Sequence, residues 1–379
     1  MMRFKTIILS LICVAILSCH GGTPSDKSRE DGDTLSLRYA ERIRIVRYEG
    51  YTQVSLSDPW NSGKTLHTYL LVPSGQAVPK GLPEGTVVRT PLRRSVISTS
   101  VHCGLVVNLG CRDRIAGVCD PQYIHHPWIE SQVKNGKIAD CGSGLSPTVE
   151  KIIDMEPDAI FLSPFQNSGG YGQVEHLGIP IIETADYMET SALGRAEWMR
   201  FYGLLFGVEE RADSLFDTIE KEYKELRALA AQDASHLSVL MDKQTGSVWY
   251  VPGGRSTVGR MIGEASARYP WSENNDSGSL QLPFESVLNK GADCDVWLFR
   301  YNSPHAITYN ELLTENQGYN QFKAFTSRQA YGCNTATSTF YEDTPFNPAL
   351  LLRDIVIITH PGIKGLGETK YFKKVNSEK

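Results

Sequence analysis

One long uninterrupted helix constrains this chain more than any other stretch of its sequence. Residues 209–232 (EERADSLFDTIEKEYKELRALAAQ) contain no glycine or proline, and nearly all of them are good or tolerable helix formers. At 1.5 Å per residue this helix would span roughly 35 Å. Strand and helix patterns flank it on both sides, which predicts a rigid strut between two lobes; a long surface helix within one domain is the alternative. Apolar residues recur along it at steps of three and four, on one face: Leu215, Ile219, Tyr223, Leu226 and Ala230.

The first eighteen residues have the features of an export signal. Arg3 and Lys5 precede an uncharged apolar run, residues 6–17, which is shorter than the ~20 residues that span a bilayer. The run ends at Cys19, preceded by a small residue and branched apolar ones, as in a bacterial lipoprotein signal. We therefore expect Cys19 to be the first mature residue and to carry a lipid anchor, although an ordinary secretory signal cleaved nearby is the alternative. Residues 19–36 are expected to form a flexible tether.

Charge, length and cysteine content narrow the class of protein. The formal charge is −5, and removal of the signal takes two further positive charges away, which argues against a nucleic-acid partner. The roughly 340 mature residues exceed one comfortable core and predict two domains. No C-x-x-C pair is present, so a structural zinc site is not expected, and the spacing leaves disulfide pairing open. The cysteines that remain after Cys13 and Cys19 are Cys103, Cys111, Cys119, Cys141, Cys294 and Cys333.

Alternating strand and helix signals on both sides of the strut predict an α/β fold: two doubly wound, Rossmann-like lobes joined by one long rigid helix. SVISTS, RIAGVCD, DAIFLSP and IPIIETA are the expected strands of the first lobe, and the second lobe repeats the alternation with VWYVPGG and DVWLF. The expected divisions are the N-terminal lobe at 37–190, a lobe-closing helix and the strut at 191–232, the C-terminal lobe at 233–367, and a solvated polar tail at 368–379.

Ligands of doubly wound sheets bind beyond the carboxyl ends of the strands. His125 and His126, with Tyr123 close by, suit iron or cobalt as ligands, or would line a ligand cleft; neighbouring histidines usually point apart. His102 begins a helix after a strand, where a capping or packing role is an equally good explanation. The candidates in the first lobe are His102, Tyr123, His125, His126, Phe165, Asn167, Asp186 and Tyr187.

Aromatic and basic residues fall near the strand ends of the second lobe. Arg255 and Arg300 suit the carboxylates or phosphate of an anionic chelate, and the aromatic rings suit a flat or extended ligand. The glycines at 253 and 254 are not part of a phosphate loop, because the G-x-x-x-x-G-K-[ST] pattern is absent; they form a tight turn or an entry loop to the cleft. The candidates are Trp249, Tyr250, Arg255, Arg300, Tyr301, Tyr341 and Glu342.

A short pattern occurs once in each half of the chain. Pro147 precedes Glu150, the apolar pair of KIIDMEP and the strand DAIFL; Pro283 precedes Glu285, SVLNKGADC and the strand DVWLF. The prolines suit a first helical position and the glutamates the positive end of a helix, which is a sufficient structural explanation for each alone. The repeated occurrence predicts two acids on the same outer edge, placed to dock onto two basic sites of a two-fold partner.

The chain resembles the periplasmic substrate-binding proteins of ABC importers for iron complexes and vitamin B12. The resemblance covers roughly residues 94–362 and rests on an ordered set of stretches: SVISTSVHCGLVVNLGCRDRIAGV, SPTVEKIIDMEPDAIFL, GRAEWMRFYGLLFG, VPGGRSTVGRMIG, LPFESVLNKGADCDVWLF and FYEDTPFNPALLLRDIVIITHPG. It implies two lobes on one rigid helix, a cleft between them, and a glutamate in each lobe that pairs with permease arginines. These glutamates match Glu150 and Glu285. Residues 44–91 precede the family's usual first strand and have no assigned role.

We therefore expect a lipid-anchored, monomeric periplasmic receptor that captures a ferric siderophore, haem or cobalamin and delivers it to an ABC permease dimer with its ATPase. No cofactor, catalytic residue or certain metal ligand is assigned. A surface scavenger that serves an outer-membrane receptor is one alternative, and a chelate-processing enzyme is another. The hypothesis of an enzyme lacks support, because the catalytic motifs G-x-S-x-G and H-E-x-x-H are absent from the sequence. The sequence does not identify which chelate is bound or which membrane holds the anchor.

Overall fold

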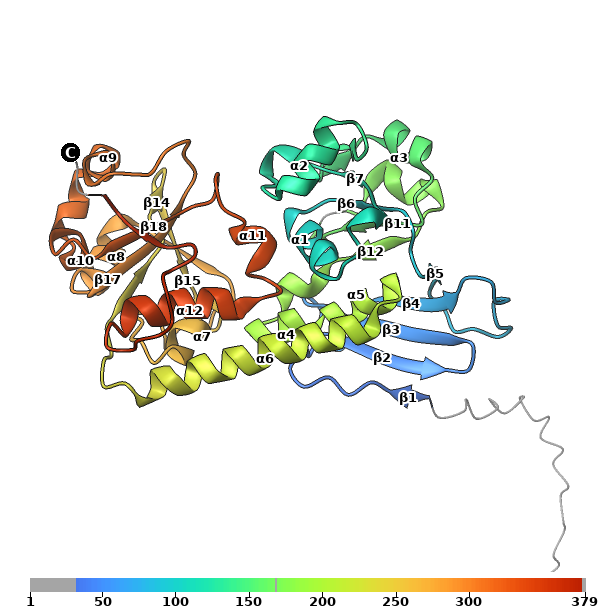
Figure 1. The fold of residues 1–379 in the computed structure, drawn as a ribbon, viewed down its shortest axis with the longest axis horizontal. Coiled ribbons are helices and arrows are strands. Elements are labelled where there is room, and N and C mark those ends of the chain that lie inside the picture. Colours follow the sequence, from blue (N-terminus) through green and yellow to red (C-terminus); the bar gives the residue numbers. More distant parts are fainter. Residues whose placement is uncertain (1–31, 168, 377–379) are drawn as a thin grey trace, which may run out of the picture.

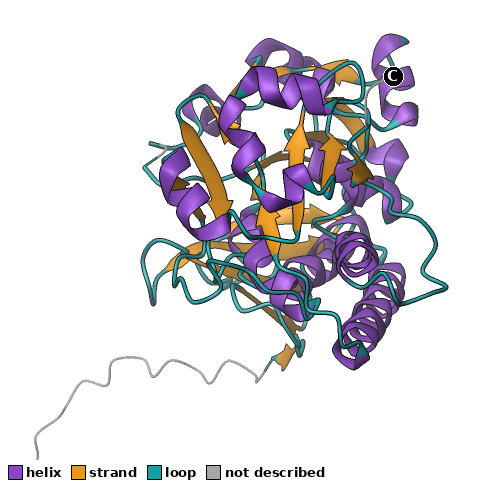
Figure 2. Cartoon of the chain, turned by 90° about the vertical axis from the view of Figure 1, so that its left-hand side faces the viewer, coloured by secondary structure: helices purple, strands orange, loops and turns teal. Residues whose placement is uncertain are grey.

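The computed structural model describes residues 32–167 and 169–376, which form two α/β lobes side by side along one long helix (Figure 1). Seen from the side of the C-terminal lobe, helices flank the strands (Figure 2). The predicted fold class is confirmed. Cys19 and most of the predicted tether lie outside the described residues. Within the described ranges, no helix is long and apolar enough to cross a membrane.

The N-terminal lobe contains a five-stranded parallel sheet in the order β12-β11-β6-β7-β8. Later strands lie on both sides of β6, which is the arrangement of a doubly wound sheet. The interior strand β11 (AIFL) is buried along its whole length, as expected for a parallel strand covered on both faces. The connection from β11 to β12 contains a short 3-10 helix, η3. The bounds are β6 (Ser95–Ile97), α1 (Ser100–Asn108), β7 (Ile115–Val118), α2 (Pro127–Lys134), β8 (Ala139–Asp140), β9 (Gly142–Ser143), β10 (Ser146–Pro147), α3 (Val149–Met155), β11 (Ala159–Leu162), η3 (Gly172–Leu177) and β12 (Ile181–Glu183).

A second sheet, here called the N-terminal sheet, precedes the parallel sheet in the sequence. Its strands are β1 (Asp33–Thr34), β2 (Ile43–Tyr48), β3 (Tyr51–Ser57), β4 (Thr65–Pro73) and β5 (Thr86–Thr90). β2, β3 and β4 pair antiparallel in sequence order, and β1 and β5 add one strand at each edge. Ile45, Val54 and Tyr69 are buried in the core of the N-terminal lobe. The predicted tether ends too late, because β1 and Leu35 already belong to the folded part.

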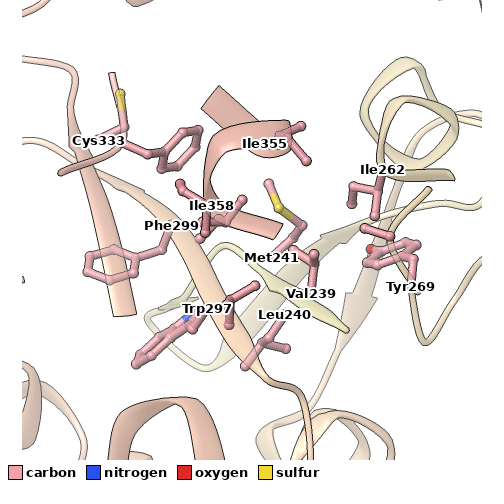
Figure 3. Close-up of a cluster of buried hydrophobic side chains, with 14 of the residues drawn as sticks. Val239, Leu240, Met241, Ile262, Tyr269, Trp297, Phe299, Cys333, Ile355 and Ile358 are labelled. Carbon is pink, nitrogen blue, oxygen red and sulfur yellow. The ribbon is translucent and has the colours of Figure 1, made fainter. Parts of the chain in front are cut away.

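The C-terminal lobe has a smaller sheet, in which β13, β17 and β18 are parallel and β19 is an antiparallel edge. The predicted strand VWYVP leaves this sheet and joins a separate antiparallel one, β14-β15-β16. Figure 3 shows part of its core, which includes Trp297 and Phe299 of β17 and Ile355 and Ile358 of α12. The bounds are β13 (Val239–Met241), β14 (Gln244–Thr245), β15 (Val248–Pro252), α7 (Thr257–Glu264), β16 (Ser279–Leu282), α8 (Phe284–Gly291), β17 (Val296–Tyr301), α9 (Tyr309–Glu315), α10 (Lys323–Thr326), β18 (Ala330–Asn334), α11 (Phe340–Asp343), α12 (Pro348–Thr359) and β19 (Lys373–Lys374).

The prediction of a solvated tail from residue 368 is wrong for most of that segment. Tyr371 and Phe372 are buried in the core of the C-terminal lobe, and β19 pairs with β18. The backbone N–H groups of Lys370, Tyr371 and Phe372 all donate to the buried carboxylate of Asp354 on α12. The tail is therefore part of the lobe.

The strut α6 (Glu209–Gln232) has the predicted bounds and reaches both cores. It follows α4 (Ala192–Glu197) and α5 (Met199–Phe206), and Gly207, at a φ of 66°, ends α5 in the left-handed region that favours glycine. The first half of α6 packs in one hydrophobic core and the second half in the other, so bending it would disrupt both. The residues are Ala212, Phe216 and Ile219 for the N-terminal core, and Tyr223, Leu226 and Ala230 for the C-terminal core.

The segment between β1 and β2 ties the N-terminal sheet to the connecting helices. The fully buried carboxylate of Glu197 on α4 accepts N–H groups from Arg38, Tyr39 and Ala40 at 2.7–2.9 Å. Near the middle of α6, Glu220 accepts the Tyr39 hydroxyl at 2.5 Å and pairs with Arg38 at 2.7 Å. The N-terminal sheet is therefore fastened to the strut.

Candidate ligand-binding site

A cavity of about 440 Å³, here called the N-lobe cavity, opens at the carboxyl ends of β6, β7 and β11. This is the edge that the doubly wound topology selects for ligands. Phe165, half exposed, is the one predicted residue of this lobe that lines it. The sequence reasoning missed the others that carry polar groups: Ser98, Thr99, Asp120, Ser146, Ser163, Tyr171 and Gln173.

Asp120 carries the only charge among the described residues that line the N-lobe cavity. Its backbone lies in the left-handed region at a φ of 47°, two residues after the end of β7. Its carboxylate accepts the Gly144 N–H at 2.7 Å and the Gln122 amide at 3.3 Å. Strained backbone of this kind is common at functional sites. An acid as the last residue of a predicted strand was the signal that could have identified it.

A second cavity of about 170 Å³, here called the junction cavity, lies between the connecting helix α4 and the C-terminal lobe. Arg195 of α4, Arg300 at the end of β17 and Tyr341 of α11 line it together with mainly apolar side chains. The prediction placed Arg300 and Tyr341 in a cleft, and the structure brings both to this cavity. Arg195 was not predicted, since nothing local distinguishes it within a helix.

Both arginines of the junction cavity are paired with aspartates that follow strands. Arg195 Nε lies 2.9 Å from Asp186 Oδ2, and Arg300 makes a two-point contact with Asp242 at 2.6 and 2.9 Å. Burial by itself raises the pKa of Asp186, but the charges of His102 and Arg195 and hydrogen bonds from His102 and Tyr202 lower it to about 2. The cavity therefore presents guanidinium groups whose charge is already balanced.

Two predicted cleft residues are buried, and these predictions are wrong. His102 is 3% exposed, its Nδ1 lies 2.7 Å from Thr99 Oγ1, and its Nε2 lies 2.8 Å from Asp186 Oδ1. Its ring fixes Asp186 and has no free nitrogen for a ligand. Trp249 has no exposed surface and donates its indole N–H to Met241 O at 3.0 Å. It packs in the core of the C-terminal lobe because it points inward from β15.

The loop with Tyr123, His125 and His126 does not assemble a metal centre. In the described part of the chain, no three His, Cys, Asp or Glu side chains gather in a way that holds a metal ion. The His125 N–H instead donates to the carboxylate of Glu342 at 2.7 Å. Glu342 lies on α11, which packs against α1 between the lobes (Figure 1). This contact joins the two lobes at a second place besides α6.

The remaining candidates lie outside the linings of both cavities, and their role in binding stays a prediction. The Tyr187 hydroxyl donates to Pro164 O, and the Tyr301 hydroxyl accepts the Ile307 N–H. Added Cβ atoms at Gly253 and Gly254 would lie 2.3 and 2.4 Å from backbone oxygens of segment 272–278, so these glycines serve a tight packing contact. The residues that line neither cavity are Tyr123, His125, His126, Asn167, Tyr187, Tyr250, Arg255 and Tyr301.

Comparison with known proteins identifies the class. The model of the family described as periplasmic binding protein matches residues 97–337, more than half of the 379 residues, and the chain belongs to that family. Proteins of this class bind small molecules and work with permeases of ABC importers.

Three similar proteins illustrate the match. The chain is 22% identical over 412 residues to an uncharacterized lipoprotein of Methanocaldococcus jannaschii (MJ0878), covering 99% of this chain and 97% of that one. A periplasmic heme binding protein from Pseudomonas aeruginosa is 17% identical with a TM-score of 0.60, over 76% of this chain and 99% of that chain. The periplasmic vitamin B12 binding protein of Vibrio cholerae is 12% identical with a TM-score of 0.52, over 73% and 99%. These structural likenesses show the shared fold.

The N-terminal sheet lies outside the family match, which begins at residue 97. The Pseudomonas aeruginosa protein is matched over nearly its whole length by only 76% of this chain. The alignment with the Methanocaldococcus jannaschii lipoprotein covers 99% of this chain and so includes the sheet. The sheet is therefore outside the family match, whereas the alignment with that relative extends over the sequence that forms it.

Proposed function

We propose that the protein captures a metal chelate between its lobes and delivers it to the permease of an ABC importer. The observation that carries the proposal is the junction cavity, which Arg195, Arg300 and Tyr341 line from three different elements. Strand ends of the C-terminal lobe, the connecting helix α4 and the bridging helix α11 meet there. A ligand there would contact the C-terminal lobe directly and the N-terminal lobe through Arg195, whose partner is Asp186, and would thereby stabilise one relative arrangement of the lobes.

The linings favour a chelate with little net negative charge. Asp186 and Asp242 already balance the two arginines, and Asp120 adds a negative charge at the N-lobe cavity. A polyanionic ligand would lose its hydration without meeting a free cation, which costs free energy. Hydroxyl, amide and aromatic groups lining the cavities suit a neutral ferric hydroxamate or a corrinoid better. The names of the structural relatives include Fe3+-hydroxamate transport and vitamin B12 binding.

Delivery would use one acid on each lobe. Glu150 and Glu285 are both exposed and both occupy the second position of a helix, α3 and α8. The prolines are not at the predicted first helical position, because Pro147 ends β10 and Pro283 is the N-cap of α8. The equivalent placement of the acids nevertheless fits two basic sites on a permease dimer, where charge pairs set the register of docking.

We further propose that the protein is exported and held at a membrane by lipid on Cys19, in the periplasm. The sequence before residue 20 and the lipoprotein names of two relatives support this. Labelling of cells with a radioactive fatty acid tests it: wild-type protein should carry label and a Cys19→Ser variant should not. Equal labelling of both proteins would contradict the anchor site.

A double variant, Glu150→Ala with Glu285→Ala, tests delivery. Purified double variant should bind the chelate as the wild type does, while cells that express it should lose uptake of that chelate. Glu210→Ala with Glu273→Ala removes two exposed acids elsewhere and serves as the charge-matched control. Unchanged uptake by the first double variant would contradict docking at these positions.

A further inference from the structure

Two cysteines lie opposite each other at the β8 edge of the parallel sheet of the N-terminal lobe. β7 and β8 run parallel, with Val118 paired to Asp140, and Cys119 and Cys141 each come one residue later. The Cys141 N–H donates to Val118 O at 2.8 Å, so the pairing continues past the strand ends. Adjacent strands are about 4.8 Å apart, and disulfides join residues whose Cα atoms are about 4.4–6.8 Å apart. The backbone spacing therefore suits a disulfide.

The two side chains also point to the same face. Gly117 and Cys119 share one face of β7, because strand residues two apart do so. A Cβ atom added at Gly117 would lie 2.7 Å from Cys141 Sγ, which places that sulfur over this face. The interaction between the two thiols raises the pKa of Cys119 and lowers that of Cys141. The side chains of Cys119 and Cys141 therefore face each other across the strand pair.

Three of the other cysteines in the described residues interact with oxygen atoms and not with a second thiol. The Cys111 thiol donates to Leu109 O at 3.7 Å, Cys333 lies 4.0 Å from the Ser338 hydroxyl, and Cys294 interacts with Ser238. The Cys141 thiol also donates to a carbonyl oxygen, Ala139 O at 3.9 Å, but it has the Cys119 thiol as a second neighbour. That neighbouring thiol distinguishes Cys119 and Cys141 from the other three.

We propose that Cys119 and Cys141 form a disulfide when the chain meets a disulfide oxidant in the exported compartment, a setting that rests on the proposed function. One thiolate attacks a sulfur of the oxidant and releases a thiol, and the second thiolate then displaces the other half as a second thiol. The two cysteines lose two electrons and two protons in total, the oxidant's S–S bond is reduced, and one new S–S bond forms. Both thiols are buried, so the reaction occurs while the lobe is folding or locally open.

The bond would brace the wall of the N-lobe cavity. The ring that it closes begins beside Asp120 and contains His125, which contacts α11. Segment 142–149, which supplies the opposite wall, follows Cys141 directly. Cys119 and Cys141 also pack with Ile152 and Met155 of α3, the helix that carries Glu150. The disulfide would therefore fix the cavity wall and the base of the proposed docking helix together.

Peptide mapping of the full-length purified protein tests the proposal. The protein is refolded with oxidised glutathione, denatured, alkylated and digested without reductant. We expect one linked peptide pair, Cys119 with Cys141, and alkylated Cys103, Cys111, Cys294 and Cys333. The Tm of the oxidised protein should exceed that of the dithiothreitol-treated protein by on the order of 5 °C, because the cross-link restricts the unfolded chain.

Two variants separate this pair from buried cysteines in general. The Tm difference should vanish in the Cys119→Ser, Cys141→Ser double variant and persist in Cys294→Ser. Alkylation of both Cys119 and Cys141 in the oxidised wild type, or linkage of either to another cysteine, would overturn the proposal. The wild-type map decides this even if the double variant fails to fold. It is also independent of ligand binding, so the proposed function can fail while the disulfide stands.

Discussion

Two arginines line the junction cavity, and each is paired with an aspartate of a different lobe; the two pairs differ in burial. Asp186 of the N-terminal lobe has no exposed surface and holds Arg195, His102 and Tyr202. The Arg300 side chain of the C-terminal lobe keeps 37% of its surface exposed against Asp242. The first pair fastens α4 to the strand-end loop, whereas the second leaves a guanidinium edge within reach of a ligand. The Asp186–Arg195 pair thus has a structural role, whereas in the proposed function the Asp242–Arg300 pair contacts the ligand.

Removing each aspartate should separate the two roles most clearly. Asp186→Ala leaves Arg195 without its buried partner, so we expect a loss of about 3–5 kcal/mol in unfolding free energy. Asp242→Ala leaves Arg300 partly in water and should cost about 1–2 kcal/mol. Urea denaturation of the two variants measures both. Equal losses would show that the pairs do the same work.

The N-terminal lobe should also dominate the dependence of stability on pH. Burial raises the pKa of Glu183 to about 7, although a hydrogen bond from Tyr171 lowers it. Its Oε2 is buried without a hydrogen-bond partner. Because the pKa of Glu183 is higher in the folded state than in the unfolded state, its contribution to stability is greatest below about pH 4.5. That contribution falls by about 2–3 kcal/mol by pH 7.

Glu183→Gln isolates that contribution from other carboxyls. Urea denaturation between pH 4.5 and 7.5 should show a flatter profile for this variant than for the wild type. Glu156→Gln, an exposed residue, is the control and should keep the wild-type slope. A wild-type slope in Glu183→Gln would contradict the assignment.

The arginines sharpen the comparison at the level of binding. Arg300→Ala should lower the affinity for the chelate about tenfold, equivalent to about 1.4 kcal/mol, with a modest loss of stability. Arg195→Ala should instead destabilise the protein more, because it strands Asp186. Calorimetric titration and denaturation of both variants give the two readouts. If affinity and stability fell in the same ratio in Arg300→Ala and Arg195→Ala, the two arginines would not have different roles.

The smallest expected effect is the closure of the lobes. α6 packs in both cores, and the contact between His125 and Glu342 joins the lobes a second time. Rotation on ligand binding should therefore be a few degrees, on the order expected of packed elements that slide slightly. X-ray scattering of free and loaded protein should give nearly superimposable curves. A large change in radius of gyration would contradict a rigid strut.

Long periodic elements were predictable from the sequence, but tertiary partners were not. The bounds of α6 follow from 24 residues without glycine or proline, and the βα alternation identifies the parallel sheet of the N-terminal lobe. The strand at 248–252 was predicted, but its pairing with β16 is not a local property. Adjacent strand residues face opposite sides, and sequence does not tell which of Trp249 and Tyr250 points inward.

Parts of the site depend on contacts between distant residues. His102 meets Asp186, 84 positions away, and that contact converts a candidate ligand residue into a support. Arg195 and Arg300 line one cavity although the strut separates them in sequence. In the tail, the lysines around Tyr371 and Phe372 suggested a solvated segment, because the acceptor Asp354 on α12 was not visible. The strand ends in the sequence indicated the general region of the binding site, but packing between distant residues determines which side chains line it.

The most direct test of a chelate held at the junction cavity is a titration of the purified protein with cobalamin, haem, a ferric hydroxamate and a ferric catecholate. Tryptophan quenching and visible absorbance follow binding to the wild type, Tyr341→Ala and Leu229→Ala, whose side chains are 41% and 40% exposed. We predict saturable binding of a chelate with little net negative charge, weakened in Tyr341→Ala and unchanged in Leu229→Ala. No binding of any chelate, or equal affinities in all three proteins, would contradict the account.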